Sequence, residues 1–320
     1  METLGAASLM IEIANLTKRY GGGRGVAALD DVTFSVSDGE IVGFVGLNGA
    51  GKTTTIRITS GVALPSSGKV SIDGYDIVTR KREASECLGW VPEFPNYEQN
   101  ARAKNLLLYF AGFHQLERGV AERRASELFQ RLELSGNEGK KLSAYSQGMK
   151  KRFSLSLALL PDPKNLLFDE LLNGLDPQGI QFIRSLMLDL KKNGKSVLLS
   201  SHILSEIEVM SDRIVFINRG RIIKVVTKSE LASIERSKSV IRMVVPNLSE
   251  AGLDYLRGLG SVSVEPESVS LSGFEGDPSA VSAELMRRGF LLREFSLEKT
   301  SLEEYFFKLV GESSGSQAAA

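Results

Sequence analysis

Two short segments carry the residue types that phosphate chemistry requires. The first places four residues between Gly46 and Gly51 and follows Gly51 with Lys52 and Thr53. Glycines leave room for a phosphate and let successive N–H groups turn inward, and the positive end of a following helix adds to the attraction. The pattern is that of a nucleotide-binding P-loop. The predicted nucleotide-binding residues here are Gly46, Leu47, Asn48, Gly49, Ala50, Gly51, Lys52, Thr53 and Thr54.

In such a loop the lysine reaches the β- and γ-phosphates, and the first hydroxyl binds Mg²⁺. Asp169 and Glu170 form the second segment, directly after the apolar run Leu166–Phe168. Asp169 suits Mg²⁺, directly or through a water molecule. Glu170 could polarise an attacking water as a general base, which typically contributes about 10²–10⁴-fold. The alternative is an ordinary solvated acidic strand end.

These side chains need a parallel sheet to bring them together. Ligands of open α/β sheets bind at the carboxyl ends of the strands, where both segments would lie. Alternating apolar strands and helices predict a mainly parallel, doubly wound sheet. Its strands are expected at Ile41–Val45, Asn165–Phe168, Ser196–Leu199 and Arg213–Ile217, with helices near 177–192 and 203–210.

Two subdomains are expected to interrupt this sheet. An antiparallel β subdomain is predicted from Leu9–Ala14, from the alternation of Val32, Phe34 and Val36, and from Lys69–Ile72. A helical subdomain is predicted at about 90–160, within a mostly helical region that begins at residue 80. Its helices are expected at Asn105–Phe113, Gly119–Leu134 and Ser146–Leu160.

The pattern changes near Lys228. The predicted elements then run β-α-β-β-α-β, the order of a small ferredoxin-like α+β domain. They are expected at Ser239–Val245, Ser249–Leu259, Ser261–Glu265, Ser268–Ser272, Pro278–Arg288 and Phe290–Ser296, followed by a helix at Leu302–Leu309. We therefore predict domains at 9–227 and 228–311, and a disordered tail at 312–320.

Composition limits the partners. The 320 residues include 39 Lys+Arg and 39 Asp+Glu, which gives no electrostatic case for nucleic acid as a partner. Cys87 is the only cysteine, so no intramolecular disulfide can form and a reducing compartment is expected. No apolar run approaches the length of a membrane span, and the N-terminal residues lack the pattern of a signal peptide.

Three further segments, taken with the first two, resemble those of ATP-binding cassette (ABC) ATPases over about residues 9–225. Tyr145-Ser-Gln-Gly-Met-Lys150 resembles the signature of that family, which normally reads Leu-Ser-Gly-Gly-Gln. Asn173–Pro177 resembles the D-loop, and Leu199-Ser-Ser-His202 resembles the switch histidine after its strand. The resemblance implies a P-loop NTPase fold that binds ATP and Mg²⁺.

The resemblance also implies roles for individual residues. Lys52, Glu170 and His202 would be catalytic, with His202 bonded to the γ-phosphate. Ser146, Gln147 and Gly148 would bind the γ-phosphate of ATP held by a second subunit, with Asp176 nearby, and Tyr20 would stack on adenine. The alternative for Ser146 is an ordinary helix cap. A lone tyrosine after a strand is weak evidence for adenine stacking.

Two positions depart from the family pattern. Glu93 stands where the family normally has a glutamine; it could still bind Mg²⁺ but adds a negative charge beside the phosphates. Leu171-Leu172 follow the acid pair, where the family normally has Pro-Thr. The second change leaves the catalytic ligands in place but affects the geometry of the loop that follows them. The predicted metal ligands are Thr53, Asp169 and Glu93.

The function implied is that of the ATPase subunit of a transporter, most similar to multidrug, antibiotic and sodium exporters. Its partners would be a membrane permease on a separate chain and a second ATPase subunit, in a homodimer. The protein would be cytoplasmic and bound to the inner face of the membrane through the permease. The alternatives are a soluble ABC protein of translation or repair, and a regulatory cassette with weak ATPase activity.

Overall fold

The computed structural model describes residues 9–21, 25–237, 240–274, 276–298 and 301–315. The chain divides into two compact units, the first ending at Val225 and the second beginning at Val226. This division of the chain does not test the functions predicted for the two domains.

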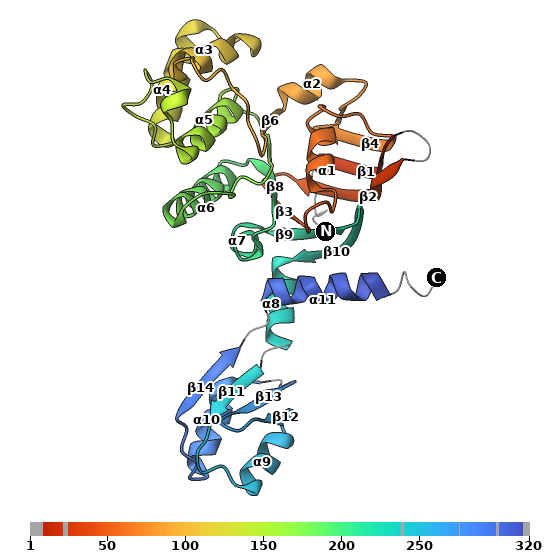
Figure 1. Ribbon diagram of the computed structural model, residues 1–320, viewed down its shortest axis with the longest axis vertical. Helices are drawn as coiled ribbons and strands as arrows, with labels where there is room; N and C mark the ends of the chain where they lie inside the picture. Colours follow the sequence, from red (N-terminus) through yellow and green to blue (C-terminus); the bar gives the residue numbers. More distant parts are fainter. Residues whose placement is uncertain (1–8, 22–24, 238–239, 275, 299–300, 316–320) are drawn as a thin grey trace, which may run out of the picture. The chain divides into compact units, whose positions relative to one another are not determined.

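A six-stranded sheet in the order β10-β9-β3-β8-β7-β6 forms the centre of the first unit (Figure 1). β3 pairs in parallel with β8 and β9, and β7 pairs in parallel with β6 and β8. The prediction of a mainly parallel, doubly wound sheet is therefore confirmed. The strands are β3 (Ile41–Val45), β6 (Leu88–Val91), β7 (Asn165–Phe168), β8 (Ser196–Ser201), β9 (Arg213–Asn218) and β10 (Arg221–Thr227), and the helices between them include α1 (Lys52–Thr59), α6 (Pro177–Lys192) and α7 (Leu204–Met210).

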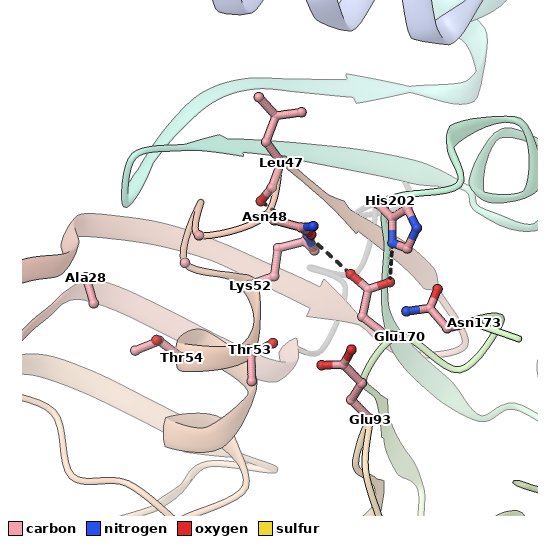
Figure 2. A pocket seen from close by; sticks show the side chains of 12 residues that line it. Ala28, Leu47, Asn48, Lys52, Thr53, Thr54, Glu93, Glu170, Asn173 and His202 are labelled. Carbon is pink, nitrogen blue, oxygen red and sulfur yellow. Dashed lines mark hydrogen bonds and ion pairs between the residues drawn. The ribbon is translucent and has the colours of Figure 1, made fainter.

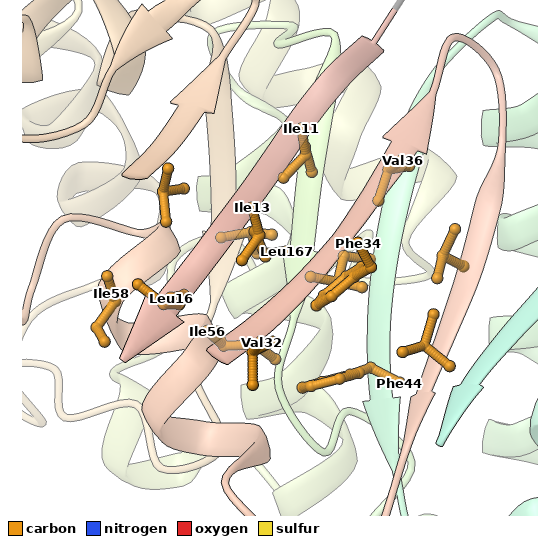
Figure 3. Packing of buried hydrophobic residues seen from close by; sticks show 14 of the residues in the cluster. Ile11, Ile13, Leu16, Val32, Phe34, Val36, Phe44, Ile56, Ile58 and Leu167 are labelled. Atoms are coloured by element: carbon orange, nitrogen blue, oxygen red, sulfur yellow. The ribbon is translucent and has the colours of Figure 1, made fainter. Parts of the chain in front are cut away.

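An antiparallel sheet in the order β2-β1-β4-β5 is the second layer of this unit. It consists of β1 (Leu9–Tyr20), β2 (Val26–Ser37), β4 (Ser67–Ile72) and β5 (Tyr75–Asp76). Its buried apolar side chains pack with those of the central sheet, and the ring of Phe34 stacks on that of Phe44 with centroids 5.0 Å apart (Figure 3). β3 lies inside this core and is buried at all five residues. The packing of β3 therefore holds in place the point from which the next loop starts.

Three helices form the helical subdomain: α3 (Ala103–Phe113), α4 (Arg118–Arg131) and α5 (Gln147–Leu159). They pack on one another, and α5 also packs on β6 (Figure 1). The region from residue 80 to residue 160 is mostly helical, as predicted, but Leu88–Val91 is a strand at the edge of the central sheet, which the prediction did not include. A short helix, α2 (Lys81–Glu86), and a 3₁₀ turn, η2 (Leu142–Ala144), complete this region.

The second unit contains a four-stranded antiparallel sheet in the order β12-β13-β11-β14. With its two helices this is the predicted ferredoxin-like order, built from β11 (Val240–Val244), α9 (Glu250–Arg257), β12 (Ser261–Val264), β13 (Val269–Ser272), α10 (Pro278–Arg287) and β14 (Glu294–Glu298). The last strand lies later than the predicted Phe290–Ser296. Ser239, the predicted start of the first strand, lies outside the described residues.

Two more helices belong to the second unit, α8 (Lys228–Ser237) and α11 (Leu302–Gly315). α11 extends beyond the predicted Leu302–Leu309. The prediction of a disordered tail from Glu312 is therefore wrong for residues 312–315, which are helical. Residues 316–320 lie outside the described part of the chain.

The start of β3 is anchored by an ion pair between Glu40 and Arg213. The Arg213 Nε and Nη2 atoms donate to the Glu40 carboxylate at 2.7 and 2.8 Å, and the Ser37 N–H donates to it at 2.8 Å. Burial alone would raise the pKa of the Glu40 carboxyl. The bonds from Arg213 and Ser37, with the Arg213 charge, outweigh burial and lower that pKa below its usual value.

A depressed carboxyl pKa adds stability above the unfolded-state pKa, and this stability is lost as pH falls through the folded-state pKa. We expect Glu40→Gln to lower the free energy of unfolding by about 2 kcal/mol near neutral pH, the usual size for charged hydrogen bonds. The loss should shrink at pH values below the ordinary 4.5 of this carboxyl. Urea unfolding across pH measures it, with Glu86→Gln in the exposed Arg82 pair as control. A pH-independent difference would contradict the assignment.

Candidate functional site

The loop between β3 and α1 can be built only with glycine at two places. Gly51 has φ +116°, and a Cβ there would lie 2.7 Å from Leu29 Cδ2. A Cβ at Gly46 would lie 2.4 Å from the carbonyl oxygen of Ile217. A side chain at Gly46 would therefore displace the backbone, and one at Gly51 would be strained by the positive φ. α1 begins at Lys52, so the loop ends at a helix N-terminus, a favourable place for an anion.

A pocket of about 240 Å³ opens over this loop (Figure 2). Ten of the twelve lining residues were predicted from the sequence: Leu47, Asn48, Gly49, Gly51, Lys52, Thr53, Thr54, Glu93, Glu170 and His202. The other two, Ala28 and Asn173, were missed. Asn173 belongs to the predicted D-loop segment Asn173–Pro177, and its Oδ1 atom is buried without a hydrogen-bond partner among the described residues.

Glu170 joins the loop to the switch histidine. Its Oε1 atom lies 3.2 Å from Lys52 Nζ, and its Oε2 atom lies 2.9 Å from His202 Nδ1 (Figure 2). Lys52 Nζ also donates to the Gly46 carbonyl at 2.7 Å. Glu170 is 4% exposed and Lys52 5% exposed, so this pair is withdrawn from bulk water. A buried carboxylate held by a lysine and a histidine is well placed to orient a water molecule beside a phosphate.

Asp169 and Glu93 add negative charge to the same region. Ser200 Oγ donates to Asp169 Oδ1 at 2.7 Å. Burial is the main reason that the pKa of Asp169 is raised, and the Glu170 charge adds to it against hydrogen bonds from Ser200 and Thr53. Burial also raises the pKa of Glu93, followed by repulsion from Asp169 and Glu170. Several carboxylates in one region, with oxygen atoms that can act as metal ligands, favour the binding of a cation.

The donor set fits Mg²⁺ bound together with phosphates. The Thr53 hydroxyl and the carboxylates are hard oxygen ligands. No group of three or more His, Cys, Asp or Glu side chains in the described residues could hold a metal by itself. Because Mg²⁺ usually takes one or two carboxylates and completes its shell with water and substrate phosphates, this is the expected arrangement.

The remaining predicted residues are not among those that line the pocket. Gly46 and Ala50 are in the loop, and Asp169 is buried beside the pocket.

Ser146 caps α5, since its Oγ accepts from the Met149 N–H at 3.2 Å, and Asp176 caps α6 by accepting from the Gly179 N–H at 2.8 Å. Tyr20 is 46% exposed, with Lys18 Nζ 4.9 Å from its ring centroid. Within the described chain, the pocket lining includes none of Tyr20, Ser146, Gln147, Gly148 and Asp176. Their roles stay predictions.

Known proteins resemble this chain along most of its length. The family model described as "ABC transporter" matches residues 29–173. The bacitracin transport ATP-binding protein BcrA of Bacillus licheniformis is 31% identical, covering 95% of this chain and 98% of that protein. The Nod factor export ATP-binding protein I of Burkholderia orbicola is 32% identical, covering 94% and 97%.

A solved structure also resembles this chain. It is described as the structure of an ATP-binding subunit of an ABC transporter, and it matches with a TM-score of 0.64 at 31% identity. The match covers 70% of this chain and 92% of that one. The two relatives match 95% and 94% of this chain, so the similarity to them extends beyond the cassette into the second unit.

Proposed function

The chain belongs to the ATP-binding proteins of ABC transporters, as an ATP-hydrolysing subunit, and from this premise we propose that it powers an exporter through a separate membrane permease. One observation carries the mechanism: buried Glu170 lies between Lys52 and His202 at the rim of the phosphate loop. Lys52 binds the β- and γ-phosphates in this proposal. Glu170 accepts a proton from the attacking water, and His202 orients Glu170 and detects the γ-phosphate.

Thr53, Asp169 and Glu93 would hold Mg²⁺ in this site. The metal, when bound, neutralises charge that develops on the phosphates. Glu93 is the unusual member, because it brings a charge where the family normally has an amide. We expect it to strengthen the hold on the cation, since it lies near two other carboxylates whose repulsion a cation would relieve.

The signature segment supports a dimer. Ser146 and the backbone at Gly148 lie at the N-terminus of α5, which attracts anions, yet neither lines the pocket of its own chain. A Cβ at Gly148 would meet nothing within 4 Å, so this backbone is open to approach. We propose that it closes the phosphate site of a second copy in a head-to-tail homodimer. ATP then closes the dimer, and hydrolysis reopens it.

The loop after Glu93 offers a contact for the permease. Tyr97 is occupied within its own unit, because its ring packs edge-on against buried Phe153 with centroids 5.6 Å apart. Phe94 is 83% exposed, and the exposed rings of Tyr109 and Phe113 lie on α3. We propose that Phe94 docks on the permease and reports its state to Glu93, the adjacent residue in the pocket.

We expect Phe94→Ala to weaken permease binding by about tenfold, the equivalent of about 1.4 kcal/mol for one aromatic contact. ATP turnover by the isolated chain should stay at the wild-type rate, because Phe94 does not line the pocket. Titration of the purified chain against permease in detergent gives the affinity. Leu188→Ala on α6, also an exposed apolar residue, is the control. Equal affinities for wild type and Phe94→Ala would place the contact elsewhere.

The relatives support the direction and the location. BcrA is named for bacitracin transport and the Burkholderia protein for Nod factor export, and we propose export here too. None of the helices in the described ranges is long and apolar enough to cross a membrane. We propose a cytoplasmic subunit held at the inner face of the membrane by the permease, with the second unit stabilising or regulating the dimer.

Co-purification tests this function. The tagged chain, expressed with membrane proteins encoded beside it, should copurify with a permease from detergent-solubilised membranes. The permease should also raise its ATP turnover. Recovery with ribosomes or DNA instead would favour the translation or repair alternative, which the comparisons do not support. Permease binding without turnover would favour the regulatory cassette.

A further inference from the structure

Lys151 connects the signature helix to the turn that carries Glu170. It lies on α5, five residues after Ser146. Its Nζ atom lies 2.8 Å from the Leu171 carbonyl oxygen and 3.4 Å from that of Glu170, and it also donates to the Asn173 carbonyl. An ammonium group has three donors, and all three point to one turn.

The turn that receives these bonds needs outside support. Glu170 has φ +48°, a left-handed conformation that is unfavourable for a residue with a side chain. Leu171 and Leu172 are each 1% exposed, so water does not reach this backbone freely. Buried carbonyl groups without donors are costly. Lys151 supplies donors at the position where the chain changes direction between β7 and α6.

The charges around the Lys151 ammonium also favour its bonds to this turn. Burial lowers the pKa of the Lys151 ammonium, whereas the nearby charges of Glu170 and Glu93 favour its protonated form. The adjacent Arg152 is used differently, since it pairs with Glu133 at 2.7 Å and lies over the ring of Phe182. Among these two basic residues of α5, Lys151 is the one whose charge is directed at the catalytic turn.

Ser146 and Lys151 belong to one rigid unit. Ser146 is the N-cap of α5, and Lys151 lies in its second turn. A movement of α5 that shifts Ser146 must therefore carry the 170–173 turn with it or break the three bonds. The same turn contains Asn173, which lines the pocket.

We propose that Lys151 is a positioning residue that sets the orientation of Glu170 and couples it to the signature segment of its own subunit. Engagement of Ser146 with the nucleotide of the second copy then changes the hydrolytic competence of the first copy. This inference rests on the proposed head-to-tail dimer. It gives the two half-sites a direct covalent and hydrogen-bonded connection within each chain.

Steady-state ATP hydrolysis by the full-length chain tests the positioning role. Lys151→Met keeps the length of the side chain and removes its donors. We expect kcat to fall at least about tenfold with KM changed by less than about twofold, because the phosphate loop is untouched. Lys151→Arg restores donors and should recover most of kcat. Lys104→Met on α3, an exposed lysine of the same subdomain, is the control.

A loss of packing alone would not be reversed by the larger arginine, so this rescue separates positioning from structure. If Lys151→Met does not fold, Lys151→Gln keeps two donors and should give an intermediate kcat. A kcat within about twofold of wild type in a folded Met or Gln variant would overturn the proposal. So would an arginine variant as slow as the methionine variant.

A double-mutant cycle with Ser146→Ala tests the coupling. If Lys151 transmits the engagement of Ser146, the two effects on ln kcat should be smaller together than their sum. Strict additivity would overturn the coupling. The wild-type chain is measured alongside. A slow variant beside an active wild type concerns Lys151, whereas an inactive wild type contradicts the hydrolysis on which both proposals rest.

Discussion

Glu170→Gln should lower ATP turnover by about 10²–10⁴-fold, the usual contribution of a general base. Both carboxylate oxygens of Glu170 are engaged, one by Lys52 and one by His202. Glutamine has nearly the same shape and keeps one acceptor, so the loop and the pocket should stay in place. The amide cannot take a proton from water at neutral pH. The expected loss therefore falls on kcat, with ATP affinity retained.

The same variant should accumulate a dimer in Mg-ATP, which light scattering measures. A hydrolysis-deficient site holds the nucleotide that closes the two copies. Glu122→Gln on α4, in an exposed pair with Arg118, should turn over ATP as wild type does. Equal turnover by wild type and Glu170→Gln would contradict the role of the acid. A monomer at all nucleotide concentrations would contradict the two-site dimer.

The pocket could be read from the sequence where its chemistry is local. Gly46 to Thr54 is contiguous, and its backbone requirements are visible as glycines. Asp169 and Glu170 end a strand whose apolar run is continuous because the strand is buried. Ala28 could not be found this way. It comes from β2, and its position depends on how the antiparallel sheet meets the phosphate loop, for which its neighbours in sequence give no signal.

The errors in the elements have physical causes. β1 was expected to end at Ala14 but continues to Tyr20. Asn15 has φ +49°, and the register with β2 shifts beyond Ile13, so the regular alternation that marks a strand is lost there. β14 was placed too early because it pairs with β11 alone at the sheet edge and is mostly exposed. An edge strand buries too little to leave a clear pattern.

Lys52→Met should weaken ATP binding by about 100-fold, the equivalent of about 3 kcal/mol for a buried contact between opposite charges. It should also destabilise the protein without nucleotide. Lys52 and Glu170 are each 5% exposed at the side chain, and removing one partner of a buried ion pair typically costs about 3–5 kcal/mol. We expect about 3 kcal/mol, because the bond between His202 and Glu170 remains. Urea unfolding and nucleotide titration measure the two effects.

The double variant Lys52→Met/Glu170→Gln separates these two roles of the lysine. Glutamine removes the unpaired charge and its repulsion with Asp169 and Glu93, whose pKa values are raised partly by Glu170. Stability should therefore return toward wild type, while ATP affinity stays low because no ammonium faces the phosphates. If the second change instead restored ATP affinity, the loss in Lys52→Met would come from the freed carboxylate repelling ATP. If it restored neither property, Lys52 and Glu170 would not form the energetic pair that their 3.2 Å separation indicates.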